Sequence, residues 1–175
     1  MIRIKIILHT NIKMNSSNKV KLFYKRNNEE VDMPDHFDPQ EQTTQNATEG
    51  DIFIFFGDFY ADKSRRNNSK VASTIITYEV QYVGNEETIM TTEIKCDFGN
   101  GNTLVLIGNI RAEFFEIKSG KLNPYKTENL TFPNLAIVGG TGDFEHTTGS
   151  AKYIINGHQA GVGSLGELDL MINKK

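Results

Sequence analysis

The glycine-rich run at residues 136–145 is the segment whose residue types come nearest to a known chemical motif. Gly139, Gly140 and Gly142 fall within four residues, and clustered glycines occur in loops that bind phosphate groups. A Walker loop ends in Gly-Lys-Ser/Thr, which this run lacks, and a Rossmann turn opens a helix, for which Thr147-Thr148-Gly149 is a poor start. Because glycine reaches positive φ without a Cβ clash, the run predicts a tight corner or bulge between two strands.

The histidines and the cysteine do not form a pattern that would bind a metal. His9, His36, His146 and His158 share no metal-ligand spacing, and Cys96 is the single cysteine. One cysteine excludes an internal disulfide framework and a cysteine metal cluster. We therefore expect no metal site, and we expect Cys96 to be a core residue of a strand.

Bulk properties indicate one globular domain and exclude some partners. A chain of 175 residues can bury a real core, and its net charge of −3 gives no electrostatic basis for binding nucleic acid. No stretch approaches the roughly 20 apolar residues that span a bilayer. The apolar N-terminus is broken by Arg3 and Lys5 and lacks a small-residue cleavage site, so it is an unconvincing signal peptide. The sequence leaves the compartment open.

Apolar runs of strand length, separated by turn residues, continue through almost the whole chain. We expect strands at 19–25, 52–60, 71–82, 88–98, 104–117, 132–138, 150–156 and 165–172. One face of the third strand carries Ala72, Thr74, Ile76, Tyr78, Val80 and Tyr82. The Gly99-Asn100-Gly101-Asn102 sequence predicts a hairpin, since Asn and Gly both tolerate positive φ. This regular spacing, with no convincing helix, favours an antiparallel barrel or sandwich.

The strands define a single β-barrel domain at 19–175, preceded by an N-terminal segment, 1–18, whose folding the sequence does not show. Residues 27–50 form a long polar connector that holds Pro34 and Pro39. Its composition cannot bury enough apolar surface to form a core. A loop of this length is unusual inside a compact domain, so the connector is either disordered or a lid.

Three blocks of sequence resemble the allene oxide cyclase family and the related dirigent proteins, in the family's order. The first block is Gly50-Asp51-Ile-Phe-Ile-Phe through Phe59-Tyr60, with the basic turn Lys63-Ser-Arg-Arg66 and Lys70-Val71 after it. The second is Phe98-Gly99 followed by Leu104 and Gly108. The third is Leu135-Ala-Ile-Val-Gly-Gly-Thr-Gly142 with Phe144-Glu145, Gly149 and Lys152. The likeness covers about residues 50–153.

The resemblance implies an all-β fold, an eight-stranded antiparallel β-barrel of the allene oxide cyclase/dirigent type that assembles as a homotrimer. Cyclases of this family close a fatty-acid epoxide inside the barrel without a cofactor, and dirigent proteins position phenolic species there. The family's functional positions fall at Lys25, Gly57, Tyr78 and Thr148, where this chain has other residue types. Because Lys25 cannot act as the family's carboxylate and Gly57 has no side chain, no catalytic residue is assigned.

The resemblance leaves a lipocalin-like cavity as the expected site, with Tyr24, Tyr60 and Tyr78 placing hydroxyl groups on an apolar wall. The alternative is that these are interface or surface tyrosines. Lys25 is either a buried cation matched to a carboxylate ligand or a solvated lysine at a strand edge. Three functions stay open: a barrel that binds a small apolar or phenolic ligand, a cofactor-free isomerase or stereochemical guide, and a structural protein with a filled barrel.

Overall fold

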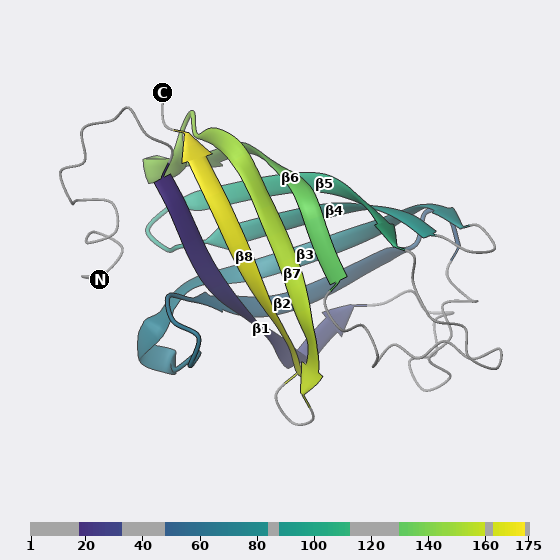
Figure 1. Ribbon diagram of the computed structural model, residues 1–175, viewed down its shortest axis with the longest axis horizontal. Coiled ribbons are helices and arrows are strands. Elements are labelled where there is room, and N and C mark those ends of the chain that lie inside the picture. Colours follow the sequence, from purple (N-terminus) through teal and green to yellow (C-terminus); the bar gives the residue numbers. More distant parts are fainter. Residues whose placement is uncertain (1–17, 33–47, 84–87, 113–129, 160–162, 174–175) are drawn as a thin grey trace.

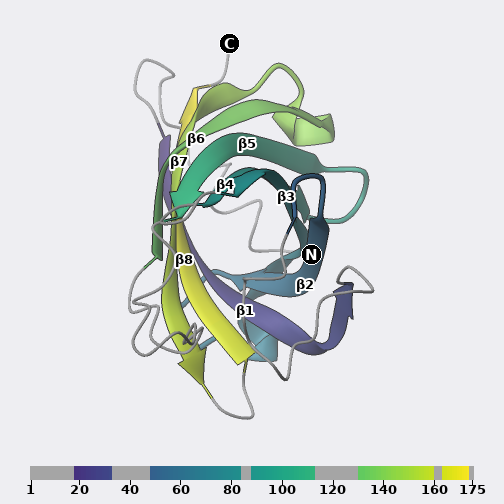
Figure 2. The same cartoon turned by 90° about the vertical axis from the view of Figure 1, so that its right-hand side faces the viewer.

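The computed structural model describes residues 18–32, 48–83, 88–112, 130–159 and 163–173. In these residues, eight antiparallel strands close into one barrel, in which each strand pairs with its neighbours in sequence and the last pairs with the first (Figure 1, Figure 2). The expected eight-stranded antiparallel β-barrel is thereby confirmed. The strands are β1 (Asn18–Asp32), β2 (Ile52–Tyr60), β3 (Lys70–Val83), β4 (Thr88–Asp97), β5 (Thr103–Ala112), β6 (Leu130–Thr141), β7 (Thr148–Gln159) and β8 (Gly163–Asn173).

Side-chain alternation in β3 follows the pattern expected from the sequence, up to one register shift. The inward face from Ala72 to Val80 is buried, and the intervening residues are more exposed. Between Val80 and Tyr82 the register against β4 shifts, and Tyr82 is 46% exposed. Because the shift breaks the period of two, Tyr82 does not continue the buried face.

The first strand is longer than its sequence pattern suggests. β1 runs to Asp32, so the first six residues of the expected connector, 27–32, belong to a strand. Pairing to β2 holds this extension, with Val31 opposite Phe55 and Asp32 opposite Ile54, after an irregularity that begins at Arg26. The rest of the connector, 33–47, and the N-terminal segment, 1–17, lie outside the described residues, as does the end of the fifth expected strand, 113–117.

Both turns expected from glycine are confirmed. Gly99, Asn100 and Gly101 have φ of 79°, 56° and 78°, and they connect β4 to β5 as a hairpin. At the glycine corner, Gly139 has φ of 155° and the register between β5 and β6 shifts at the same place. The short 3-10 helix η4 (Gly142–Phe144) follows and leads into β7. These positions need glycine or asparagine because other side chains rarely adopt positive φ.

Three described turns, at 61–69, 98–102 and 142–147, lie at the same end of the barrel (Figure 1). We call the part of the inner surface around Cys96, Leu104 and Leu106, beside the turns at 98–102 and 142–147, the turn half and the remainder the far half. Inward aliphatic residues pack in the turn half; Ile94, Leu104 and Leu106 are each 0% exposed. Phe144 of η4 packs on Phe98, with ring centroids 4.8 Å apart. This half is a closed hydrophobic core, and each such side chain contributes about 1.5–3 kcal/mol by burial.

Cys96 belongs to this core, as expected. It is 0% exposed, and burial raises the pKa of its thiol to about 12. A thiol that stays protonated at neutral pH is a poor nucleophile and a poor metal ligand. Cys96 therefore acts as a small apolar residue in the packing.

Candidate functional site

Polar and aromatic side chains gather in the far half, on the inward positions of five strands. Tyr24 and Tyr78 are 2% and 9% exposed, Tyr153 is 1% exposed, and Thr92 is 0% exposed. Because side chains alternate along a strand, Arg26 shares the inward face of β1 with Tyr24 and Leu22. The interior cluster is Tyr24, Arg26, Phe55, Tyr78, Thr92 and Tyr153.

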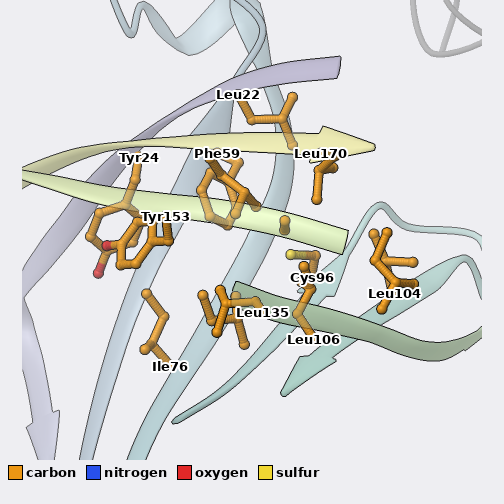
Figure 3. Packing of buried hydrophobic residues seen from close by; sticks show 14 of the residues in the cluster. Leu22, Tyr24, Phe59, Ile76, Cys96, Leu104, Leu106, Leu135, Tyr153 and Leu170 are labelled. Atoms are coloured by element: carbon orange, nitrogen blue, oxygen red, sulfur yellow. The ribbon is translucent and has the colours of Figure 1, made fainter. Parts of the chain in front are cut away.

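The aromatic rings of the interior cluster meet edge to face. The Tyr24 and Tyr153 centroids are 5.8 Å apart at 83°, and the Phe55 and Tyr78 centroids are 5.5 Å apart at 71°. Figure 3 shows Tyr24 and Tyr153 together at one end of the packed residues, with Leu104 at the other. The Arg26 guanidinium carbon lies 4.9 Å from the Phe55 centroid, within the range of a cation–π contact.

Two glycines make room for the tyrosine rings. A Cβ at Gly57 would overlap the Tyr24 ring and lie 2.7 Å from the Lys25 carbonyl oxygen. A Cβ at Gly166 would lie 3.1 Å from the Tyr153 ring. Gly57, which the family resemblance marks as a lost side chain, therefore has a positive role, since its lack of a Cβ lets Tyr24 lie flat against β2.

Arg65, in the turn between β2 and β3, fixes the backbone of the strands that carry this cluster. Its Nε donates to the Tyr24 carbonyl at 2.9 Å, and its Nη2 donates to the Gly166 carbonyl at 3.1 Å. Its guanidinium also lies 5.7 Å from the Phe23 ring centroid. The basic turn therefore ties β1 to β8 at the level of Tyr24, which its sequence alone does not reveal.

Burial keeps the three tyrosine hydroxyls neutral. It raises the pKa of Tyr24, Tyr78 and Tyr153 well above the ordinary value of 10.0, and the charge of Arg26 opposes this only in part for Tyr24 and Tyr78. A neutral hydroxyl can donate one hydrogen bond as well as accept. The tyrosine hydroxyls of the interior cluster therefore stay protonated at physiological pH.

Thr92 differs from the other buried threonine on the inner face in its hydrogen bonding. Thr74 Oγ1 donates to the Lys95 carbonyl at 2.9 Å. Thr92 Oγ1 is fully buried and has no hydrogen-bond partner among the described residues. It lies opposite Tyr78 on β3 and Gly108 on β5. A buried hydroxyl without a partner costs about 1–3 kcal/mol, so its presence at this position asks for an explanation.

The structure brings together two of the four residues expected in the cavity. Tyr24 and Tyr78 lie in the interior cluster, whereas Lys25 and Tyr60 occupy the alternate, outer face of their strands. Tyr60 is nevertheless only 4% exposed; its hydroxyl donates to Asp58 at 3.5 Å, and Asp58 pairs with Lys70 at 2.7 Å. The cation on the inner side is Arg26, one residue beyond Lys25.

Four cluster residues, Arg26, Phe55, Thr92 and Tyr153, were not among the expected site residues. Tyr153 had a usable signal, because it alternates with Ala151 and Ile155 on one face of β7. Arg26 and Thr92 had none, since neither residue type is typical of a barrel interior.

Charged side chains line a separate depression of about 490 Å³ on the outer wall of β1, β7 and β8. Lys21, one of its lining residues, pairs with Glu167 at 2.9 Å and Asp169 at 3.2 Å. The expected homotrimer, which would cover outer apolar residues such as Ile75 and Val138, stays a prediction. Within the described ranges, no group of histidine, cysteine and acidic residues could hold a metal ion, and no helix is long and apolar enough to cross a membrane.

No protein-family model matches the sequence, and no curated protein matches it significantly. Solved structures do match the fold. The pterocarpan synthase dirigent protein PsPTS1 superposes with a TM-score of 0.57 at 15% identity, over 93% of this chain and 97% of that one. A pyocyanin demethylase gives 0.52 at 17% identity, over 88% and 100% of the two chains. The Diels-Alderase AbmU from Streptomyces koyangensis gives 0.51 at 11% identity, over 92% and 70%.

At these identities the likeness shows the fold alone. It supports the dirigent-like barrel that the sequence blocks indicated. The relation to allene oxide cyclases stays a prediction. The function must be argued from the interior cluster itself.

Proposed function

We propose that the barrel binds a small apolar or phenolic molecule in its far half, against the interior cluster. The observation that carries this proposal is the Thr92 hydroxyl, which is fully buried, belongs to the strand position opposite Tyr78 and lacks a hydrogen-bond partner among the described residues. A polar atom of a bound ligand would supply that partner. Small-molecule sites are commonly built in this way, with an apolar wall and a few placed polar groups.

Solvent exposure of the inner surface supports a ligand in the far half. The inward residues Phe53 and Phe55 of β2 and Ile155 of β7 are only partly buried, although they pack on the core. In the turn half, Leu104 and Leu106 are 0% exposed. Val20 and Phe98, near the turns, are also partly buried; in the far half, Phe53, Phe55 and Ile155 retain apolar surface that a ligand would cover.

The chemistry of the cluster favours positioning over proton abstraction. Its polar groups are three neutral tyrosines, one threonine and one guanidinium, and none of these is a base at neutral pH. Such groups bind and orient a ligand and stabilise negative charge on its oxygen atoms. A stereochemical guide is the second candidate, because Gly57 and Arg65 fix the Tyr24 ring and backbone. The structural neighbours named for a pterocarpan synthase, a demethylase and a Diels-Alderase are consistent with either role.

The test is a calorimetric titration of the full chain with 2-naphthylmethanol, a neutral aromatic alcohol. We expect saturable binding to one site per chain. Tyr78→Phe keeps the ring but removes a hydroxyl donor, so the affinity should fall about two- to tenfold. The matched control is Tyr82→Phe on the same strand, where the side chain is 46% exposed and the affinity should not change.

The opposite result would favour the filled, structural barrel. If 2-naphthylmethanol, a phenol and a fluorescent fatty acid all fail to bind, the far half is not a ligand site. If binding occurs but both tyrosine variants behave alike, the ligand lies elsewhere on the protein.

A further inference from the structure

We propose that the outer wall formed by β1, β8 and β7 is a docking surface for an acidic peptide segment of a partner protein, in which two carboxylates flank one apolar side chain. The three strands lie side by side on one wall of the barrel (Figure 1). This surface faces away from the barrel interior, so the inference goes beyond the proposed ligand site and does not depend on it.

The depression of about 490 Å³ on this wall has lysines on both sides of β8. Lys21 of β1 and Lys152 of β7 both lie opposite Asp169 of β8, so these three residues form one row across the wall. In the next row, Lys19 of β1 lies opposite Met171 of β8. The lysines alternate with inward residues along their strands, so their side chains project outward, where all three are exposed.

The three lysines of the depression differ in their own partners. Lys21 is held by two carboxylates, since its Nζ lies 2.9 Å from Glu167 and 3.2 Å from Asp169. Among the described residues, Lys19 and Lys152 form no ion pair. Lys19 and Lys152 are therefore the two cations of the depression that an incoming carboxylate can reach without breaking an existing pair.

The turn at 61–69 extends the positive charge of this wall. The hydrogen bond from Lys21 lowers the pKa of Glu167, and the nearby charges of Lys63 and Arg65 lower it further. Arg65 donates to neutral carbonyl oxygens, so its charge is not cancelled. A local excess of positive charge on a chain of net charge −3 favours an acidic partner. Counting Glu167, the depression and the turn hold six cations against three carboxylates: Lys19, Lys21, Lys63, Arg65, Arg66 and Lys152 against Asp62, Glu167 and Asp169.

The spacing of Lys19 and Lys152 sets the form of the peptide. The two residues lie on strands separated by β8 and are offset by two residues along it. With strands about 4.8 Å apart and a rise of about 3.3 Å per residue, their backbone positions are about 12 Å apart. In an extended peptide, side chains four residues apart share a face and lie about 13 Å apart. The sequence Glu-Thr-Leu-Thr-Glu therefore brings one carboxylate to each lysine and its leucine over β8.

Two residues of β8 favour this peptide over a single compact anion or a lipid surface. Asp169 lies in the row between Lys21 and Lys152, so it repels a phosphate group placed at the centre of the depression. Met171 lines the depression and is 43% exposed, so it offers apolar contact to a leucine side chain. A leucine would enter the depression, whereas a flat layer of headgroups would leave it unfilled.

The experiment measures the fluorescence polarisation of a capped Glu-Thr-Leu-Thr-Glu peptide with a neutral fluorophore, titrated with the full chain at low salt. We expect saturable binding that weakens as the salt concentration rises, and about fivefold or weaker binding of the Gln-Thr-Leu-Thr-Gln peptide. Lys19→Gln and Lys152→Gln should each weaken the acidic peptide about two- to fivefold, the range of an exposed charge pair. The matched control is Lys95→Gln, which removes the same charge from the exposed outer face of β4 and should leave the affinity unchanged.

Other outcomes would overturn the inference. Equal binding of the two peptides would mean that charge does not select the partner, and an equal loss in Lys95→Gln would mean that only the net charge of the protein matters. If inorganic phosphate displaces the peptide at equal concentration, the depression binds a compact anion. If vesicles containing phosphatidylserine bind through Lys19 and Lys152 while the peptide does not bind, the occupant is a membrane surface. The affinity for 2-naphthylmethanol should not change in any of these variants, so failure here leaves the proposed ligand site untouched.

Discussion

The two halves of the inner surface are built by the same strands and the same alternation, yet they differ in what they contain. The turn half is mostly apolar and tightly packed, with Leu104 and Leu106 at 0% exposure. The far half holds three tyrosines, an arginine and Thr92, whose hydroxyl, like that of Thr147 beside the turns, has no hydrogen-bond partner among the described residues. One barrel can therefore place its stability at one end and its polar groups at the other. A change in the turn half should alter stability alone, whereas a change in the far half should alter binding.

The largest effect should come from a cavity in the turn half. Leu106→Ala should lower the free energy of unfolding by about 2–5 kcal/mol, because the lost methyl groups leave a void in a packed core. Ile107→Ala is the matched control, since Ile107 is the next residue on β5 and is 36% exposed on the outer face; it should cost less than about 1 kcal/mol. Urea unfolding of the two variants measures the difference.

Measuring ligand binding by the Leu106→Ala variant tests whether the two halves act independently. The folded Leu106→Ala protein should bind 2-naphthylmethanol with the wild-type affinity, measured below its unfolding transition. A large loss of affinity together with the loss of stability would mean that the two halves act as one unit.

A smaller effect should appear in alkali, from the tyrosines of the far half. Burial raises the pKa of Tyr24, Tyr78 and Tyr153 above the unfolded value near 10.0. The stability that depends on their neutral form is complete below about pH 10 and is lost as the pH rises further, because the unfolded chain then binds fewer protons than the folded one. Burial also raises the pKa of the Cys96 thiol from its ordinary value of 9.0, so its contribution to stability is likewise lost as the pH rises.

Tyr153→Phe should remove one of these groups. The fall in unfolding free energy above pH 10 should become less steep by about 1.4 kcal/mol per pH unit. Urea midpoints measured at several alkaline pH values for wild type and variant give the two slopes. The slope is the informative quantity, because any interaction lost with the hydroxyl at neutral pH shifts the whole curve. Equal slopes would show that Tyr153 does not resist ionisation in the folded protein.

The sequence pattern predicts the buried side chains of the turn half, but it predicts only some of those in the far half. Alternation predicts that Ile76 and Tyr78 face inward together, and the Gly99 turn needs positive φ, so strand order and core followed from local rules. The same alternation puts Lys25 on the opposite face of β1 from Tyr24, although the two residues are adjacent and both were expected in the cavity. Tyr60 follows a register shift against β3, directly after Phe59, so simple alternation does not assign its face. That Thr92 has no hydrogen-bond partner among the described residues depends on which side chains the other strands bring near it, and no local pattern encodes that.

The smallest effect, and the sharpest contrast between structural and binding roles, should come from the two inward threonines. Thr92→Val removes a buried hydroxyl that has no partner among the described residues, so the free energy of unfolding should rise by up to about 1 kcal/mol. Thr74→Val is the matched control on the neighbouring strand. It removes the bond to the Lys95 carbonyl and should lower stability by about 1 kcal/mol.

The two variants should also separate in ligand binding. Thr92→Val should weaken 2-naphthylmethanol severalfold, whereas Thr74→Val should leave its affinity unchanged, because the Thr74 hydroxyl is already bonded within the wall. A residue whose removal stabilises the protein and impairs binding is one retained for its ligand. Loss of stability in Thr92→Val with unchanged affinity would instead show that the hydroxyl has a structural partner.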